Sequence, residues 1–204
     1  MAAYEVVEGE TVSGWTAADV SGLLAVAERM RERLEPCPIE GVTPYAADFV
    51  PLLGDWRRLG ERRPPPYGLP VELLAELESR WTAVLVPGTA LHHGDLRRDN
   101  VIREPGGRLR IVDWTHLWTA PGWMDLIRLL PDVAACGIDP EAVLRRSCWR
   151  EVPDEHVNVA LAGLAGRAWR DCVLPGERRL RRMQAEQADG LLAWLSARLG
   201  GSGG

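Results

Sequence analysis

The chain contains no lysine, because all 24 of its cationic side chains are arginine. This excludes any mechanism that depends on a lysine ammonium group within the 204 residues. The net charge of -5 provides no basic surface to neutralise the phosphates of a nucleic acid, so nucleic acid is not expected as a partner.

Paired cysteines and long apolar runs are absent as well. The four cysteines are widely separated without a C-x-x-C pair, which argues against a zinc site and favours free thiols. No stretch approaches the ~18 apolar residues of a membrane span, and residues 1–9 contain no apolar segment of a signal peptide. We therefore expect a cytoplasmic protein without a membrane partner.

The residues that are present suit a globular protein, since 46% are apolar and 26% are charged. A short strand is expected at residues 4–7, and Thr16 is expected to cap the first helix. Pro51 weakens the helical pattern at 49–59, the second of those that follow. Helical spacing of apolar residues covers about 17–34, 49–59, 71–84, 121–135, a segment that opens at Asp139-Pro140, 154–173 and 177–198.

The centre of the chain has a different pattern. Short apolar runs at 90–92, 100–102 and 109–112 alternate with turn residues, and Pro105-Gly106-Gly107 predicts a hairpin between the last two runs. The expected fold class is α+β and mostly helical, with a small β-hairpin insert at the centre.

This central region carries a set of side chains suited to phosphoryl transfer. It contains the string His93-Gly94-Asp95-Leu96-Arg97-Arg98-Asp99-Asn100, and the run at 109–112 ends at Asp113. Phosphoryl transfer requires a carboxylate that orients the attacking hydroxyl and accepts its proton, and oxygen ligands that hold Mg²⁺ against the phosphates. A loop carrying Asp95 and Asn100, beside a hairpin ending in Asp113, would bring these groups together.

The string from His93 to Asn100, followed by a strand ending in Asp-Trp, resembles the catalytic loop and metal-binding motif of aminoglycoside phosphotransferases and choline kinases. These families share the catalytic lobe of protein kinases. The resemblance covers roughly residues 4–199. It implies a kinase-like C-terminal lobe in which the hairpin insert carries the catalytic loop.

The resemblance also implies roles for individual residues. Asp95 would be the catalytic base, while Asn100 and Asp113 would bind Mg²⁺ and, through it, ATP as the phosphoryl donor. His93 would buttress the loop, and Asp125 would hold the loop backbone. The acceptor would be a small-molecule hydroxyl, as in aminoglycoside, choline or homoserine kinases.

Members of these families also have an N-terminal β-lobe with a phosphate-covering loop and a lysine, and the 204 residues contain neither feature. We therefore expect residues 1–13 to be a remnant of the hinge strand, 14–199 the catalytic lobe, and 200–204 a flexible Gly/Ser tail. A missing or separate N-terminal lobe is an expected partner. Weak nucleotide binding and low turnover are expected of the chain alone.

Two other hypotheses remain open from the sequence. The chain could be a pseudoenzyme or ligand-binding module, which the absence of lysine favours and the intact Asp95, Asn100 and Asp113 oppose. It could also be an unrelated helical interaction domain. Arg97 and Arg98 suit either a phosphate contact or a solvated surface, and the sequence does not decide between them.

Overall fold

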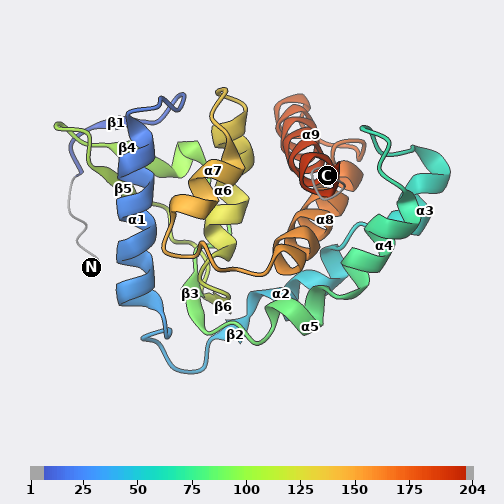
Figure 1. The fold of residues 1–204 in the computed structure, drawn as a ribbon, viewed down its shortest axis with the longest axis horizontal. Coiled ribbons are helices and arrows are strands. Elements are labelled where there is room, and N and C mark those ends of the chain that lie inside the picture. Colours follow the sequence, from blue (N-terminus) through green and yellow to red (C-terminus); the bar gives the residue numbers. More distant parts are fainter. Residues whose placement is uncertain (1–6, 201–204) are drawn as a thin grey trace.

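The computed structural model describes residues 7–200, in which helices pack beside two small β-sheets (Figure 1). One sheet has the strand order β1-β4-β5 and the other β2-β6-β3. The strands are β1 (Glu10–Thr11), β2 (Thr43–Pro44), β3 (Ala90–His92), β4 (Val101–Arg103), β5 (Leu109–Ile111) and β6 (Trp118–Ala120). The helices are α1 (Asp19–Leu34), α2 (Tyr45–Phe49), η1 (Val50–Leu52), α3 (Trp56–Arg62), α4 (Val71–Ser79), α5 (Trp81–Leu85), η2 (Arg98–Asn100), α6 (Met124–Ala134), α7 (Pro140–Arg146), α8 (Asp154–Asp171) and α9 (Arg178–Gly200).

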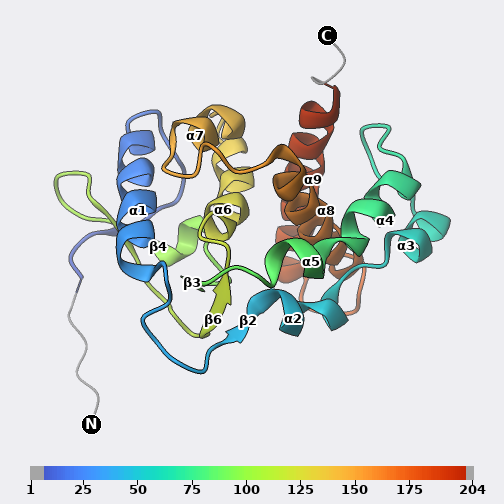
Figure 2. The same cartoon turned by 60° about the horizontal axis from the view of Figure 1, so that its bottom comes forward.

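The elements follow one another across the molecule. Figures 1 and 2 show α1 and the β1-β4-β5 sheet at one end, α6 and α7 in the middle, and α8 with α9 beyond them. Helices α3 and α4 lie at the far end, against α8. The segment between β3 and β4 therefore lies centrally, beside α6.

The predicted hairpin is present. Strands β4 and β5 pair antiparallel, with Val101 opposite Ile111, and Gly106 and Gly107 turn the chain with φ values of 89° and 85°. Strand β1 extends the hairpin by pairing with β4, so residues 10–11 form the edge of this sheet. The strands β2 and β6 were not predicted. Strand β2 has only two residues, which is too short for an alternating pattern to be recognised, and β6 forms by pairing with β3, which is distant in sequence.

Several helix predictions are confirmed, and two are wrong. Asp139 caps α7 as expected, because its carboxylate accepts from the Glu141 backbone N–H at 2.9 Å. The pattern at 49–59 is not one helix, since Pro51 lies in a 3₁₀ turn and Asp55 adopts a left-handed φ of 59°. The pattern at 71–84 is divided at Arg80, whose ψ of -1° lies outside the α-helical range.

The expectations for Thr16 and for the two chain termini have different outcomes. Thr16 does not cap α1 with its hydroxyl; instead, its hydroxyl and backbone N–H donate to the Asp19 carboxylate at 2.7 and 2.8 Å. The strand expected at 4–7 falls mostly outside the described residues, and Val7 is not in a strand. At the other terminus Gly200 ends α9, and residues 201–204 lie outside the described range.

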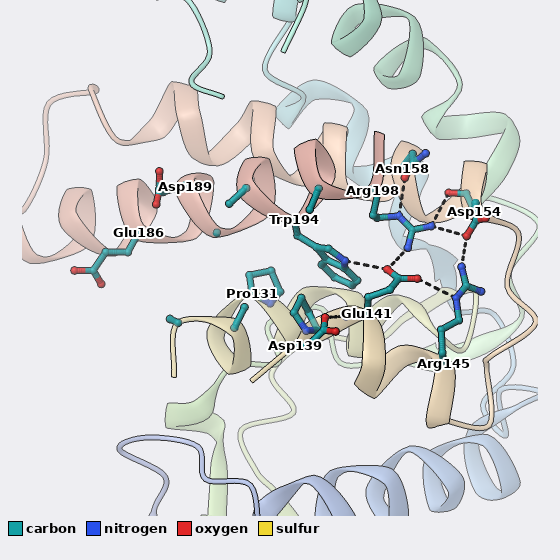
Figure 3. Close-up of a pocket in the computed structure, with 16 residues that line it drawn as sticks. Pro131, Asp139, Glu141, Arg145, Asp154, Asn158, Glu186, Asp189, Trp194 and Arg198 are labelled. Atoms are coloured by element: carbon teal, nitrogen blue, oxygen red, sulfur yellow. Dashed lines mark hydrogen bonds and ion pairs between the residues drawn. The ribbon is translucent and has the colours of Figure 1, made fainter. Parts of the chain in front are cut away.

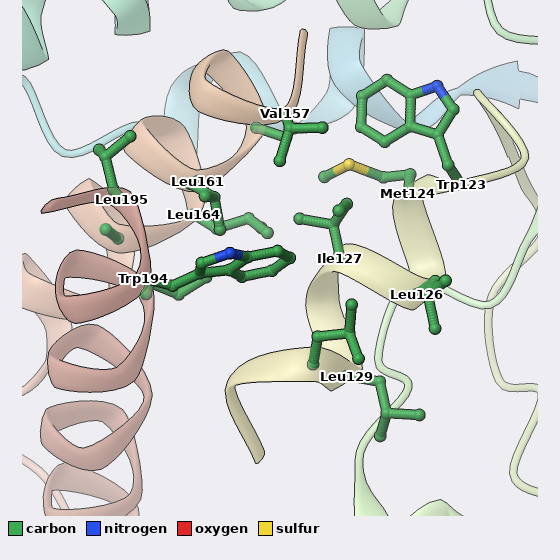
Figure 4. Packing of buried hydrophobic residues seen from close by; sticks show 14 of the residues in the cluster. Trp123, Met124, Leu126, Ile127, Leu129, Val157, Leu161, Leu164, Trp194 and Leu195 are labelled. Carbon is green, nitrogen blue, oxygen red and sulfur yellow. The ribbon is translucent and has the colours of Figure 1, made fainter. Parts of the chain in front are cut away.

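Helices α6, α8 and α9 pack together around the main hydrophobic core (Figure 4). Met124 and Ile127 of α6 are fully buried, as are Leu161 of α8 and Leu195 of α9. Trp194 from α9 inserts its indole ring between α6 and α8. This packing fixes the position of α6, which in turn borders the central loop.

An ion-pair network closes one end of the same helices (Figure 3). Glu141 of α7 accepts from Arg145 at 2.9 Å and from the Trp194 indole N–H at 3.1 Å. Arg198 of α9 contacts Glu141 and donates to Asp154 at 2.7 Å. The network therefore joins α7, α8 and α9 through side chains, in addition to their apolar contacts.

Truncation of the core should be costly. Leu161→Ala should lower the free energy of unfolding by about 2–5 kcal/mol, because Leu161 is 0% exposed and its removal leaves a cavity. Leu180→Ala is the matched control, since Leu180 is 50% exposed and its loss should change stability by less than about 0.5 kcal/mol. Urea denaturation measures both. Equal effects for the two variants would contradict this description of the core.

Candidate functional site

Residues 93–100 form a loop between β3 and β4, and the carboxylate of Asp125 holds its beginning. Asp125, in the first turn of α6, accepts from the backbone N–H of His93 at 2.8 Å and of Gly94 at 3.1 Å. The His92 ring nitrogen Nδ1 lies 3.0 Å from the same carboxylate. Asp125 thus contacts the backbone at the start of the loop.

The charge of Asp125 is buried but compensated. Burial acts to raise the pKa of this carboxyl group, but the His92 ring and the His93 backbone hydrogen bond outweigh it, so the pKa lies below its ordinary value of 3.8. Three hydrogen-bond donors around one carboxylate favour its ionised form. Asp125 is therefore an anion in the folded protein at neutral pH.

His93 connects the loop to the end of β5. Its Nδ1 accepts from the Asp95 backbone N–H at 3.3 Å, so the ring proton is on Nε2, which donates to the Val112 carbonyl at 2.9 Å. The ring also packs against Trp114, with the two ring centroids 4.8 Å apart. His93 thereby links the backbone of Asp95 to the residue that precedes Asp113.

Asn100 connects the same segments from the other end of the loop. Its Nδ2 donates to the Asp95 carbonyl at 2.8 Å, and its own carbonyl accepts from the Val112 N–H at 3.0 Å. The Asn100 amide is therefore oriented, and its Oδ1 has no hydrogen-bond partner within residues 7–200. The backbone segments that carry Asp95, Asn100 and Asp113 are tied together by four hydrogen bonds.

Asp113 follows this junction with its side chain exposed. Its φ of 65° is left-handed, a conformation in which Asp and Asn are enriched among residues other than glycine. Amide and carboxylate oxygens are hard ligands of the kind that Mg²⁺ prefers, and Mg²⁺ commonly takes only one or two from the protein. The free Oδ1 of Asn100 and the exposed carboxylate of Asp113 fit that donor set. Residues 7–200 contain no cluster of three His, Cys, Asp or Glu side chains that could hold a metal alone.

The side chain of Asp95 lines a large cleft. Its side chain is 43% exposed, with one carboxylate oxygen 3.8 Å from Arg128 Nη2 and the other 3.7 Å from Arg97 Nη2. The cleft has a volume of about 1080 Å³ and lies between α2, the 93–100 loop, α6, α8 and the start of α9. Asp95 is thus accessible to a small molecule, while Asn100 and Asp113 do not line this cleft.

Aromatic side chains form one wall of the cleft. Trp118 donates its indole N–H to Asp48 at 2.8 Å and stacks on His116, with ring centroids 4.3 Å apart. Gly94 has a φ of 78°, and a Cβ there would lie 2.6 Å from the Trp118 ring. Only glycine therefore allows the loop to approach this tryptophan. Trp118 lines the cleft, whereas Trp114 packs on His93 and does not line it.

One face of α6 carries Asp125, which the sequence indicated, and two further charged residues, Arg128 and Asp132, which it did not. Asp125, Arg128 and Asp132 lie at positions i, i+3 and i+7, and all three contact the loop. Asp132 accepts from the Arg98 backbone N–H at 3.0 Å. Three charged residues at helical spacing within an otherwise apolar helix were a usable signal for a polar site on that face.

A second cavity, of about 770 Å³, lies between α6, α7, α8 and α9 (Figure 3). Apolar side chains of α6 and α9 line most of it, and the Glu141–Arg198 network lies at one end. None of the loop residues 93–100 lines this cavity. It is therefore separate from the site around Asp95.

Comparison with known proteins identifies the family. A family model described as the phosphotransferase enzyme family matches residues 1–172, which is more than half of the chain. The chain belongs to this family, and the resemblance inferred from the 93–113 motifs is confirmed. The match ends directly after α8, so α9 lies outside it. No curated protein matches the chain. No helix within residues 7–200 is long and apolar enough to span a membrane.

Removal of the Asp125 charge should destabilise the loop and the fold. Asp125→Asn should lower the free energy of unfolding at pH 7 by about 3 kcal/mol, because it leaves buried donors without their anion. The Asp125 pKa is lowered on folding, so its contribution is fully present above the unfolded value of about 3.9 and is lost as the pH falls through the folded value. The difference between wild type and variant should therefore be constant from about pH 7 to 5 and narrow below about pH 4.

Asp99→Asn is the control for this measurement. Asp99 lies in the same loop, but its carboxylate is 55% exposed and pairs with Arg97, so the variant should lose less than about 1 kcal/mol. Urea denaturation across the pH range measures both variants. A difference for Asp125→Asn that grows with acidity would show that the sign of the pKa shift is wrong.

Proposed function

We propose that the protein transfers the γ-phosphoryl group of ATP to a hydroxyl of a small molecule bound in the cleft at Asp95. Asp95 is the base that orients the hydroxyl and accepts its proton. Asn100 and Asp113 hold Mg²⁺ on the nucleotide side. ATP as the donor places the reaction in the cytoplasm.

The observation that carries this proposal is the constrained loop around Asp95. Asp125 fixes the loop at His93 and Gly94, His93 holds the backbone N–H of Asp95, and Asn100 holds its carbonyl. The backbone of Asp95 is fixed on both sides while its carboxylate faces a cleft. A pre-positioned base that need not reorganise is what phosphoryl transfer requires from a protein.

The metal side depends on two oxygen ligands. The hydrogen bond from Asn100 Nδ2 to the Asp95 carbonyl directs the amide so that Oδ1 is free to bind a cation. The exposed Asp113 carboxylate supplies the second oxygen. When bound, Mg²⁺ would neutralise charge that develops on the phosphates during transfer.

The lack of lysine limits what these 204 residues do alone. Kinase-like enzymes position the α- and β-phosphates with a lysine, and positioning supplies much of the catalysis. Turnover by the chain alone is therefore expected to be low, and phosphate-binding groups on an N-terminal lobe would raise it. The same observation favours the second candidate, a ligand-binding module that no longer transfers phosphate.

Loss of the base should remove transfer without loss of the fold. Asp95→Asn should reduce ATP-dependent phosphorylation by about 10²–10⁴-fold, the usual contribution of a general base. Glu61→Gln, which changes an exposed carboxylate of α3 that lines neither the cleft nor the recess beside Asp95, should reduce it by less than about threefold. The assay is Mg²⁺- and acceptor-dependent formation of ADP with a panel of alcohols, amino alcohols and hydroxy acids. Binding of an acceptor with no transfer to any of them would favour the module instead.

Removal of either proposed metal ligand should weaken the Mg²⁺-dependent binding of nucleotide. Asn100→Ala and Asp113→Ala should each raise the Mg²⁺ concentration needed for half-maximal binding of an ATP analogue by at least ~10-fold, since even outer-shell partners of a metal have effects of that size. Asp139→Ala, which removes a helix cap far from the loop, is the control. Calorimetric titration at several Mg²⁺ concentrations measures the change. An unchanged Mg²⁺ requirement in both variants would remove these residues from the metal site.

A further inference from the structure

A small recess opens beside Asp95 and is rich in groups that bind anions. Its volume is about 60 Å³, which is the space of roughly two water molecules and suits a carboxylate or similar head group. The polar side chains that line it are Asp95, Arg97, Arg128, Arg167, Gln184 and Gln187. Three guanidinium groups therefore face one carboxylate in a confined space.

Arg128 is the central group of this recess. Its side chain is 8% exposed, and its Nε is buried without a hydrogen-bond partner within residues 7–200. Nη1 donates to the neutral hydroxyl of Tyr45 at 3.1 Å. Nη2 lies 3.8 Å from a carboxylate oxygen of Asp95. A separation of 3.8 Å is too long for a hydrogen bond. Arg128 therefore pairs with Asp95 through charge, but its Nη2 makes no hydrogen bond to an anion within residues 7–200.

The other cations of the recess are already paired. Arg97 makes two hydrogen bonds to Asp99, at 3.1 and 2.9 Å, and Arg167 donates to Asp171 at 3.4 Å. Arg167 also lies over the Phe49 ring, with its Cζ 5.1 Å from the ring centroid. These partners hold the two guanidinium groups in place at the edge of the recess, so they add positive potential without having to move.

Helix α9 contributes two uncharged donors. Gln184 and Gln187 are three residues apart, so they lie on one face of the helix, and both line the recess. Neither side-chain amide has a hydrogen-bond partner within residues 7–200. An oxyanion in the recess would accept from these amides beside the Arg128 guanidinium.

The recess lies on the acceptor side of Asp95. Leu164 and Ala168 of α8 and residues of α9 enclose it, whereas Asn100 and Asp113 line neither the recess nor the cleft. The groups assigned to Mg²⁺ and nucleotide lie together at the open end of the β4–β5 hairpin, opposite its glycine turn. An anion in the recess would belong to the molecule that is phosphorylated.

We propose that the acceptor is a hydroxy acid, whose carboxylate binds in the recess to Arg128, Arg167 and the two glutamine amides while its hydroxyl meets Asp95. This inference rests on the proposed function for the identity of Asp95 as base. It assigns Arg128 and Arg167 as specificity-determining residues. An alcohol or amino alcohol without a carboxylate would leave the recess unfilled.

Calorimetric binding with matched ligand pairs tests the proposal. The probes are D-glycerate, L-serine, L-homoserine and 4-hydroxybutyrate, each compared with its primary amide, which has nearly the same shape but no charge. At least one acid should bind ~10-fold or more tightly than its amide, the effect of one to two charge-assisted hydrogen bonds. Arg128→Met and Arg167→Met should each remove most of this preference.

Arg179→Met is the matched control. Arg179 is exposed and lines the same cleft but not the recess, so its variant makes the same change of charge without altering the recess. The acid preference should persist in this variant. Because Arg128 is buried, far-ultraviolet circular dichroism must confirm that its variant is folded, and the partly exposed Arg167 provides the test if it is not.

The outcomes separate this proposal from the proposed function. Failure of every acid to bind better than its amide would overturn it, as would a preference that survives both recess variants. Weaker binding of a Mg²⁺-bound ATP analogue to Arg128→Met, with acid binding unchanged, would assign the recess to a nucleotide phosphate and also overturn it. Acid binding without phosphorylation would uphold the recess but contradict transfer. Transfer to amino alcohols with no acid preference would uphold phosphoryl transfer but contradict the recess as a carboxylate site.

Discussion

The arrangement of the site depends on the buried carboxylate of Asp125. A buried anion is stable only when its lone pairs are used, and Asp125 meets this condition with the His92 ring and the backbone N–H groups of His93 and Gly94. Those donors are the start of the 93–100 loop, so the requirement to compensate one charge determines where the loop lies. Helix α6 carries Asp125, and its packing on α8 and α9 fixes the anion in space. The position of Asp95 is therefore determined by the hydrophobic core, through α6.

Part of this arrangement could be predicted from the sequence, because local patterns determine it. The glycine turn at 106–107 predicts the β4–β5 hairpin, and Asp139-Pro140 predicts the start of α7. The errors occur where local patterns are ambiguous. The apolar spacing at 49–59 suits a helix, but it is interrupted by the left-handed conformation of Asp55, which sequence does not reveal. The short strand β6 pairs with β3 on one side and β2 on the other, and these pairings depend on the tertiary fold.

The candidate site likewise has one part that the sequence could predict and one that it could not. Asp95, Asn100 and Asp113 lie within a short stretch, so a motif could identify them. The residues around the recess come from α6, α8 and α9, which are far apart in sequence, and only the packing of these helices brings Arg128, Arg167 and Gln184 together. Nothing local distinguishes Gln184 from an ordinary helix surface residue. The catalytic chemistry was therefore more predictable than the features that would select a substrate.

The geometry around Asp95 also limits the size of the acceptor. Arg128 Nη2 and the Asp95 carboxylate are 3.8 Å apart. A hydroxy acid that bonds to both adds one hydrogen bond at each end, so its carboxylate and hydroxyl oxygens are separated by no more than about 9 Å. Leu164 and Ala168 of α8 and the two glutamines of α9 form the far wall of the recess. A compact acceptor whose carboxylate is a few bonds from its hydroxyl satisfies these constraints. A large oligosaccharide could reach Asp95 through the wider cleft, which Arg128 also lines, but it would bring no carboxylate to the recess.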